Sequence, residues 1–242
     1  MDLGITGRIA VVTGSSRGIG AAVAALLEHE GARVVGVTRG GGIDVTAPDA
    51  AERIADAAGG DVDILVNNAG TSYVRDLDEL TEEDFQAAFD LHVLASLRLM
   101  RAFVPGMAER GWGRVVNVTS SSGKRPTLTT AAYSVSKAAQ SSLSRVFADH
   151  YAGSGVLINS VAPGPVSSPL WMDEGGMADQ AAAARGVSRD EVLSTQAAKP
   201  PLGRFGEPEE IASVIAFLCS ERASYVTGAA WSADGGTFAS IV

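Results

Sequence analysis

The chain has 242 residues, 46% of them hydrophobic, and a formal net charge of −9. This composition excludes a disordered chain, and the lack of a basic stripe argues against nucleic-acid binding. Because Cys219 is the only cysteine, an intrachain disulfide and a cysteine-ligated zinc site are excluded, and we predict no metal site.

No segment has about 18 uninterrupted apolar residues, and the N-terminus lacks a basic stretch followed by an apolar run. We therefore expect a cytoplasmic protein that does not enter a membrane.

Short apolar, β-branched runs alternate with longer stretches of helical period, which is typical of a parallel sheet with helices on both faces. We predict strands at Ile9–Thr13, Arg33–Thr38, Ile43–Val45, Asp63–Asn67, Arg114–Thr119, Val156–Ala162 and Ala229–Ala233. No repeat or linker interrupts this order, so residues 1–242 are expected to form one α/β domain with about seven strands. Only residues 166–203 break the rhythm, and we predict a substrate lid there, with a surface loop as the alternative.

The first predicted strand runs directly into a glycine-rich turn and then into a helical pattern. Glycines allow a tight turn and close backbone approach, while the N–H groups at a helix start attract a pyrophosphate. A turn that merely packs the first helix on the sheet is the alternative interpretation. The predicted cofactor contacts in this turn are Gly14, Ser16, Arg17, Gly18, Ile19 and Gly20.

The second predicted strand ends at Thr38 and Arg39, where a dinucleotide fold places the residue that meets the adenosine ribose. An acidic side chain there would select NAD, but Thr38 is neutral. Arg39 and Arg17 together suit the 2′-phosphate of NADP, because guanidinium groups form charge-assisted hydrogen bonds with phosphate. We therefore predict NADP(H) in preference to NAD(H), with solvated arginines as the alternative.

Ser120 closes a predicted strand, and Tyr133 and Lys137 follow with a spacing of four on a predicted helix. This spacing places the phenol and the ammonium on one helix face, where the cation would bring the pKa of the phenol toward neutrality. Proton transfer is most effective there, and Ser120 would donate a hydrogen bond to the substrate oxygen. A Tyr-x-x-x-Lys pair by itself also fits a packing role.

Five ordered motifs change this balance. In this order, the sequence resembles the short-chain dehydrogenase/reductase family in Thr13 through Gly20, Asn67 through Gly70, Ser120, Tyr133 through Lys137, and Pro163-Gly164. The segment from Leu202 to Glu210 is similar to its β-ketoacyl-carrier reductase branch. The resemblance implies a Rossmann-type doubly wound fold and a homotetramer with the Tyr133 helix in an interface.

The resemblance also implies individual roles. Tyr133 would be the acid or base, Ser120 would orient the carbonyl, and Lys137 would hold the nicotinamide ribose while lowering the pKa of the tyrosine. The remaining cofactor contacts that the resemblance implies are Asp44 and Val45 at the adenine, Asn68, Ala69 and Gly70 near its ribose, and Pro163, Gly164, Val166 and Ser168 at the nicotinamide.

Two features depart from the family pattern. His92 stands where the family has an asparagine that anchors a proton-relaying water, and we predict that it supports this relay. A buried histidine with satisfied hydrogen bonds is the alternative, because Phe85, Phe89, His92 and Ser96 follow helical spacing. Gly40-Gly41-Gly42 leaves no room for a helix between the second and third predicted strands, which opens the adenosine pocket.

Residues 166–203 contain several large apolar side chains, including Trp171 and Met172, which predict a mainly hydrophobic substrate. A carrier-bound substrate would need a basic rim, for which Arg110, Arg114, Lys124 and Arg125 are candidates, although solvated charges are the alternative. We predict transfer of a hydride between NADP(H) and a ketone or secondary alcohol. The alternatives are a non-catalytic NAD(P)-binding sensor and an epimerase or dehydratase that uses the nicotinamide transiently.

Overall fold

The sheet is wholly parallel, and its strands follow the order β2-β1-β3-β4-β5-β6 in the computed structural model, which describes residues 2–239. The strands are β1 (Ile9–Thr13), β2 (Arg33–Val37), β3 (Ile64–Asn67), β4 (Gly113–Val118), β5 (Val156–Pro163) and β6 (Ala230–Ala233). The chain moves from β1 outward to β2 and then returns to β3 on the other side of β1. This reversal is a topological switch point, the place where open α/β sheets bind ligands.

Six of the predicted strands are confirmed to within one residue at each end, but the strand predicted at Ile43–Val45 is wrong. In its place, the Asp44 carboxylate accepts hydrogen bonds from the backbone N–H and the hydroxyl of Thr46, at 2.9 and 2.7 Å. An Asx turn of this kind satisfies the backbone locally and competes with strand pairing. β2 is therefore left at the edge of a six-stranded sheet.

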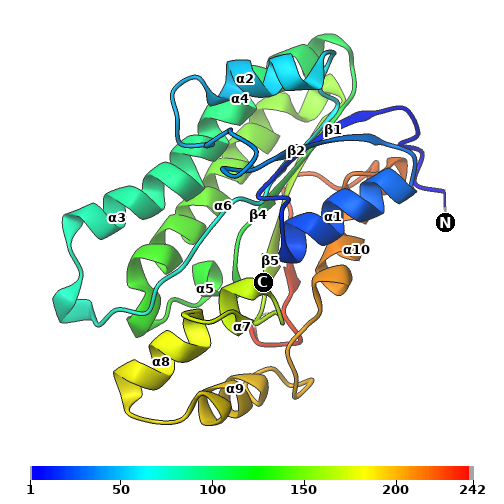
Figure 1. Cartoon of the computed structure of the whole chain (residues 1–242). Helices are drawn as coiled ribbons and strands as arrows, with labels where there is room; N and C mark the ends of the chain where they lie inside the picture. Colours follow the sequence, from blue (N-terminus) through cyan, green and yellow to red (C-terminus); the bar gives the residue numbers. More distant parts are fainter. Residues whose placement is uncertain (1, 240–242) are drawn as a thin grey trace.

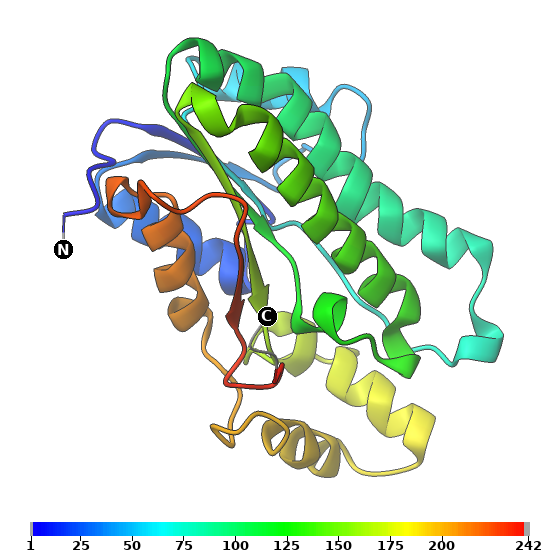
Figure 2. The same ribbon diagram turned by 180° about the vertical axis from the view of Figure 1, so that it is seen from behind.

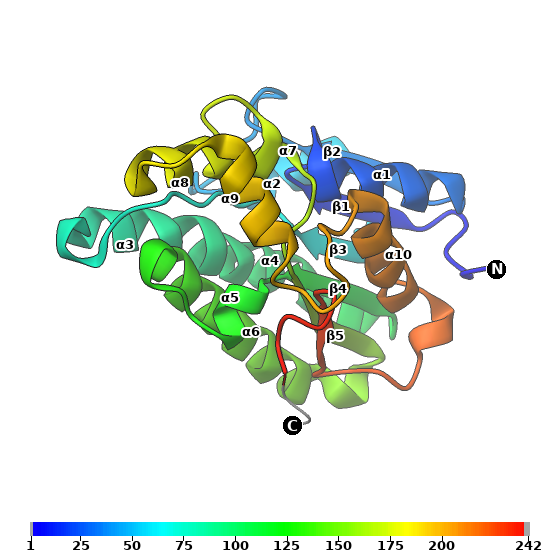
Figure 3. The ribbon, with the colours of Figure 1, turned by 90° about the horizontal axis from the view of Figure 1, so that it is seen from below.

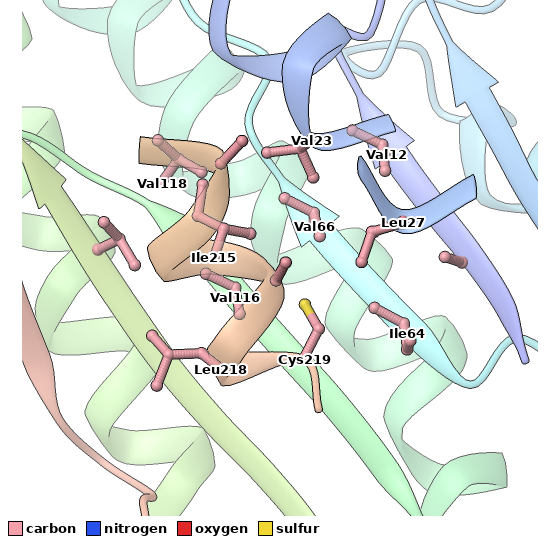
Figure 4. Packing of buried hydrophobic residues seen from close by; sticks show 14 of the residues in the cluster. Val12, Val23, Leu27, Ile64, Val66, Val116, Val118, Ile215, Leu218 and Cys219 are labelled. Carbon is pink, nitrogen blue, oxygen red and sulfur yellow. The ribbon is translucent and has the colours of Figure 1, made fainter. Parts of the chain in front are cut away.

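Helices cover both faces of the sheet, as the alternating pattern predicts (Figures 1 and 2). One face carries α1 (Gly18–His29) and α10 (Pro208–Leu218), while the other carries α2 (Ala50–Ala58), α4 (Ala95–Glu109) and α6 (Ala131–Tyr151). The first interface is a cluster of buried aliphatic side chains in which Val23 and Leu27 of α1 meet Ile215 of α10 (Figure 4). Because the middle strands are buried on both faces, they are almost continuously apolar.

A π-helical turn, Asp90–Leu94, joins α3 (Glu82–Phe89) to α4. Helix α3 begins directly after Thr81, because Thr81 and Asp84 form a capping box. The extra residue of the π turn changes the helical register. Phe85 and Phe89 consequently line a surface groove, while His92 and Ser96 are buried, so these side chains do not share one face.

Residues 166–203 form three helices, α7 (Pro169–Met172), α8 (Met177–Arg185) and α9 (Arg189–Ala197). They gather at the end of the molecule where α5 (Ser121–Lys124) lies (Figures 1 and 3). Short 3-10 turns complete the chain at Leu77–Glu79, Leu128–Thr130, Ala152–Ser154 and Glu221–Ala223. Within residues 2–239, no helix combines the length and apolar character that crossing a bilayer requires.

Candidate active site

The glycine turn connects β1 to the start of α1, which is the arrangement the sequence predicts. Gly14 has a φ of 67°, and its N–H donates to the Val37 carbonyl at 2.8 Å. A Cβ at Gly20 would lie 2.2 Å from the Gly14 oxygen, so only glycine permits this contact between turn and helix. The turn leads directly into the first N–H groups of α1, an arrangement of backbone that suits phosphate binding.

The turn after β3 is fastened directly to the end of β1. The hydroxyl of Thr13 accepts hydrogen bonds from the backbone N–H groups of Asn68 and Ala69, both at 2.9 Å. The Asn68 side chain donates to the Thr13 carbonyl at 2.8 Å. These bonds bring Asn68, Ala69 and Gly70 beside the glycine turn at the topological switch point.

The opposite flank, after β2, is open. Arg39 is exposed, and no carboxylate among residues 2–239 forms an ion pair with it. The Thr38 hydroxyl accepts a hydrogen bond from Gly41 N–H at 2.9 Å, so the three glycines form a turn and not a helix. Asp44 stands in this flank with its pKa lowered, chiefly by the Thr46 hydrogen bonds, and Val45 is buried beside it.

Ser120, Tyr133 and Lys137 lie together at the carboxyl end of β4. Ser120 caps α5, with its hydroxyl accepting a hydrogen bond from Ser122 N–H at 3.1 Å. Tyr133 and Lys137 lie on α6, and the Lys137 Nζ is 5.8 Å from the centre of the Tyr133 ring. The ammonium donates to the Val118 carbonyl at 2.8 Å and to the Gln140 side-chain carbonyl at 2.9 Å.

The pKa of the tyrosine does not follow the sequence expectation. Burial raises the pKa of Tyr133, and the hydrogen bond with Ser120 lowers it only in part. Burial also lowers the pKa of Lys137, to about 7. The predicted lowering of the phenol pKa is not found, because burial is the largest influence on Tyr133 and acts in the opposite direction.

His92 is buried within the same cluster, and both of its ring nitrogens have protein partners. Nδ1 lies 2.9 Å from the Ser136 hydroxyl, which itself donates to the Tyr133 carbonyl, and Nε2 accepts a hydrogen bond from Thr71 N–H at 3.3 Å. The imidazole meets the Tyr133 ring edge to face, with 5.4 Å between centroids. Burial, and then the Lys137 charge, hold the pKa of His92 well below its ordinary value.

The segment after β5 borders the site from the other side. Pro163 ends β5, the Gly164 N–H donates to the Ala233 carbonyl at 3.1 Å, and Val166 forms a parallel bridge with Gly206. Ser168 is buried, and a Cβ at Gly18 would lie 3.3 Å from its Cβ. The end of this segment, at Ser168, therefore packs against the glycine turn.

Residues 166–203 are held over this edge by polar contacts. Arg17 and Asp173 form an ion pair at 2.7 Å, although both side chains are more than half exposed, at 66% and 51%. The Gln180 side chain accepts a hydrogen bond from Val74 N–H at 2.9 Å and donates to the Gly175 carbonyl at 2.8 Å. One contact thus ties the segment to the glycine turn, and the other ties it to the loop after β3.

The candidate basic rim is not a single surface. Arg114 is buried at the amino end of β4, with an ion pair to Glu221 at 3.4 Å, while Arg110 pairs with Asp61 at 3.3 Å. Ser120 lies beyond the other end of β4, a strand length of roughly 20 Å away. Arg110 and Arg114 are therefore no part of a rim around the site, because they lie near the start of β4 and Ser120 lies beyond its end.

Three polar residues of this cluster were not predicted as site residues from the sequence. Gln140 and Ser136 lie on α6 and Ser96 on α4, and all three are buried. Ser136 and Gln140 are three residues after Tyr133 and Lys137, respectively, so helical spacing places them near that pair. Their polarity in a helix packed on the sheet was the available signal.

A family model and several known proteins are similar to this chain along nearly its whole length. A family model described as enoyl-(acyl carrier protein) reductase matches residues 14–237. The 3-oxoacyl-(acyl-carrier-protein) reductase of Vibrio cholerae is 33% identical over 257 aligned residues, covering 98% of this chain and 99% of the relative. The acetoacetyl-CoA reductase of Cupriavidus necator is 31% identical, covering 96% and 98%.

A solved structure is also similar along its full length. The L-sorbose reductase of Gluconobacter frateurii, complexed with NADPH and L-sorbose, superposes with a TM-score of 0.89 at 33% identity, and 100% of each chain is covered. The family model and both kinds of relative match this chain over almost its whole length. The chain therefore belongs to the short-chain dehydrogenase/reductase family of oxidoreductases.

Proposed function

We propose that this protein catalyses hydride transfer between NADP(H) and a ketone or secondary alcohol, with Tyr133 as the acid or base. The observation that carries the proposal is the convergence of Ser120, Tyr133 and Lys137 at the carboxyl end of β4. This cluster adjoins the turn after β3, since a Cβ at Gly70 would lie 3.6 Å from the Lys137 Nζ. The reacting groups and the backbone surface that suits a pyrophosphate therefore share one edge of the sheet.

The chain offers a place for the cofactor. The backbone N–H groups from Gly14 through Gly20 at the start of α1 suit a pyrophosphate, and the exposed guanidinium groups of Arg17 and Arg39 suit a 2′-phosphate. The residues from Pro163 to Ser168 would border the nicotinamide. When bound, the cofactor supplies or accepts the hydride.

The side chains account for the movement of the proton. In reduction, the Tyr133 hydroxyl transfers its proton to the substrate oxygen as the carbonyl carbon gains the hydride, and in oxidation the proton returns to the phenolate. Ser120 donates a hydrogen bond to that oxygen as negative charge develops on it. Because burial raises the pKa of Tyr133, the phenol carries its proton at neutral pH and can serve as the acid in reduction.

His92 supports this site by position. Its neutral ring fastens Thr71 to Ser136 and packs against the Tyr133 ring. Because both ring nitrogens already have protein partners, we propose that His92 orients Tyr133 and does not anchor a proton-relaying water.

The substrate is proposed to be a mainly hydrophobic carbonyl compound. In residues 166–203, Trp171 packs edge to face on Phe205 with 5.7 Å between centroids, and Met172 is half-buried beside it. Relatives of this chain are named for carrier-bound, CoA-bound and sugar substrates. With two of the four rim residues at the far end of β4, a hydrophobic ketone without a carrier is the simpler substrate.

The test is spectrophotometric turnover of NADPH against a panel of ketones that runs from aliphatic and aromatic ketones to acyl-thioesters and ketoses. We expect turnover with the hydrophobic ketones and retained NADPH binding with lost turnover in Tyr133→Phe. Tight NADPH binding by the wild type with no turnover across the panel would support a non-catalytic sensor.

A further inference from the structure

Gln140 is a buried polar residue that no part of the proposed reaction uses. It lies on α6, one turn after Lys137, and is 1% exposed. Its side-chain carbonyl accepts a hydrogen bond from the Lys137 Nζ at 2.9 Å. A buried ammonium needs such acceptors, because it has lost the hydration that stabilises its charge in water.

The orientation of the Gln140 amide is set by a second chain of hydrogen bonds. Its NH₂ donates to the Ser96 hydroxyl at 2.9 Å, and that hydroxyl donates its only hydrogen to the His92 carbonyl at 2.8 Å. Ser96 can therefore act only as an acceptor toward Gln140, which turns the amide oxygen toward Lys137. Ser96 and His92 belong to α4 and to the π turn before it, so the chain of bonds joins two elements.

The surroundings of Lys137 contain little other compensation. The titratable groups that face it are Tyr133 from α6 and His92 from the π turn, and neither is anionic at neutral pH. Among residues 2–239, its only other protein acceptor is the Val118 carbonyl of β4 at 2.8 Å, and no carboxylate there forms an ion pair with it. Of its three N–H donors, two are engaged and one is left for a bound ligand.

We propose that Gln140 is a positioning residue that keeps the Lys137 ammonium charged and aimed into the active site. Ser96 and the His92 carbonyl, in turn, hold the Gln140 amide in place. The consequence for catalysis rests on the proposed function, in which Lys137 holds the nicotinamide ribose. The consequence for the charge of Lys137 does not, because it follows from the protein alone.

The experiment measures the titration of Lys137 in the cofactor-free protein. The chain has only three lysines, Lys124, Lys137 and Lys199, so ¹³C NMR of protein labelled at the lysine ε-carbon gives few signals, and Lys124→Arg and Lys199→Arg assign them. In the wild type the midpoint should lie near 7. In Gln140→Leu it should fall by about one pH unit, because the ammonium loses a hydrogen bond.

Gln140→Glu provides the opposite change, because a carboxylate in the same place stabilises the ammonium and should raise the midpoint above that of the wild type. Ser144→Ala is the matched control. Ser144 is buried one turn further along α6 and accepts a hydrogen bond from Asn117 at 3.0 Å, away from Lys137. Its removal should leave the Lys137 midpoint unchanged.

Opposite displacements in the two Gln140 variants support the proposal, and a mere packing role would not produce them. An unchanged midpoint in both, or displacement in the same direction, overturns it. If Gln140→Leu does not fold, the direction of Gln140→Glu decides. If the wild type never turns over NADPH, the proposed function is refuted, but the titration of Lys137 can still be interpreted. In an active enzyme, the decrease of kcat/KM at high pH should follow the Lys137 midpoint in each variant.

Discussion

The two ends of the proposed cofactor site are built differently. At the catalytic end, Lys137, Gln140 and His92 are almost fully buried; Lys137 donates to Gln140, and Ser96 links Gln140 to the His92 carbonyl. At the adenosine end, Arg39 is exposed, and Arg17 makes an ion pair with Asp173 at the surface. Buried polar groups are expensive to leave unpaired, whereas exposed charges are screened by water and salt. Single substitutions at the catalytic end should therefore change the reaction rate strongly, whereas single substitutions at the adenosine end should change the cofactor preference only modestly.

Tyr133→Phe should produce the largest effect. Loss of the phenolic proton should reduce kcat by about 10³-fold, because general acid catalysis contributes roughly 10² to 10⁴. NADPH binding, followed by fluorescence, should remain. Tyr151→Phe at the far end of α6 is the control. If Tyr133→Phe and Tyr151→Phe have comparable activity, Tyr133 is not the acid or base.

His92 should make the protein sensitive to acid. The folded pKa of His92 lies well below 6.5, so below pH 6.5 the unfolded chain binds a proton that the folded chain does not. The free energy of unfolding should therefore decrease as the pH falls, by about 1.4 kcal/mol per pH unit from this group. Urea denaturation between pH 7 and 5 should show a shallower decrease in His92→Asn than in the wild type.

The exposed His150 provides the control. The free energy of unfolding of His150→Gln should decrease with falling pH as steeply as that of the wild type. An equally steep decrease in His92→Asn would show that this buried imidazole is not the acid-sensitive group. Kinetics of His92→Asn and His92→Phe between pH 6 and 9 address the relay separately. If the pH dependence of kcat changes in both variants, His92 takes part in proton transfer.

Arg39→Ala should weaken NADPH binding by about tenfold and leave NADH binding nearly unchanged, because one charge-assisted hydrogen bond to a phosphate is removed from a solvent-exposed site. Titration calorimetry at two salt concentrations should show the difference shrinking at high salt. Arg145→Ala, on the surface of α6, should change neither affinity. The preference for NADP is wrong if wild-type protein binds NADH at least as tightly.

Asp173→Asn should produce the smallest effect and in the opposite direction. Asp173 holds Arg17 away from other anions, so its neutralisation should tighten NADPH binding by about threefold, the scale of an exposed ion pair. Glu174→Gln, the adjacent exposed carboxylate, should have little effect on the same titration. A weaker affinity in Asp173→Asn would indicate that the ion pair supports the binding site and does not compete with it.

By itself, the sequence determined the parallel sheet, the glycine turn and the helical spacing of Tyr133 and Lys137. These features are local, because β-branched runs, glycine conformations and a spacing of four need no distant partner. The Ile43–Val45 strand failed for a local reason as well, since the Asp44 turn competes with pairing at a sheet edge. The order of residues along the chain also suggested that Arg110 and Arg114 lie near Ser120. They do not, because they are near the start of β4 and Ser120 follows its end.

Tertiary structure alone decided the charge states and partners of the site. The pKa of Tyr133 rises and that of Lys137 falls because both groups are buried, and burial is set by elements that are distant in the chain. The π turn likewise brings His92 and Ser96 inward, although helical spacing groups them with Phe85 and Phe89. The contact between Gln140 and Lys137 has a helical spacing, but its orientation depends on Ser96 from another helix, and no local pattern contains that information.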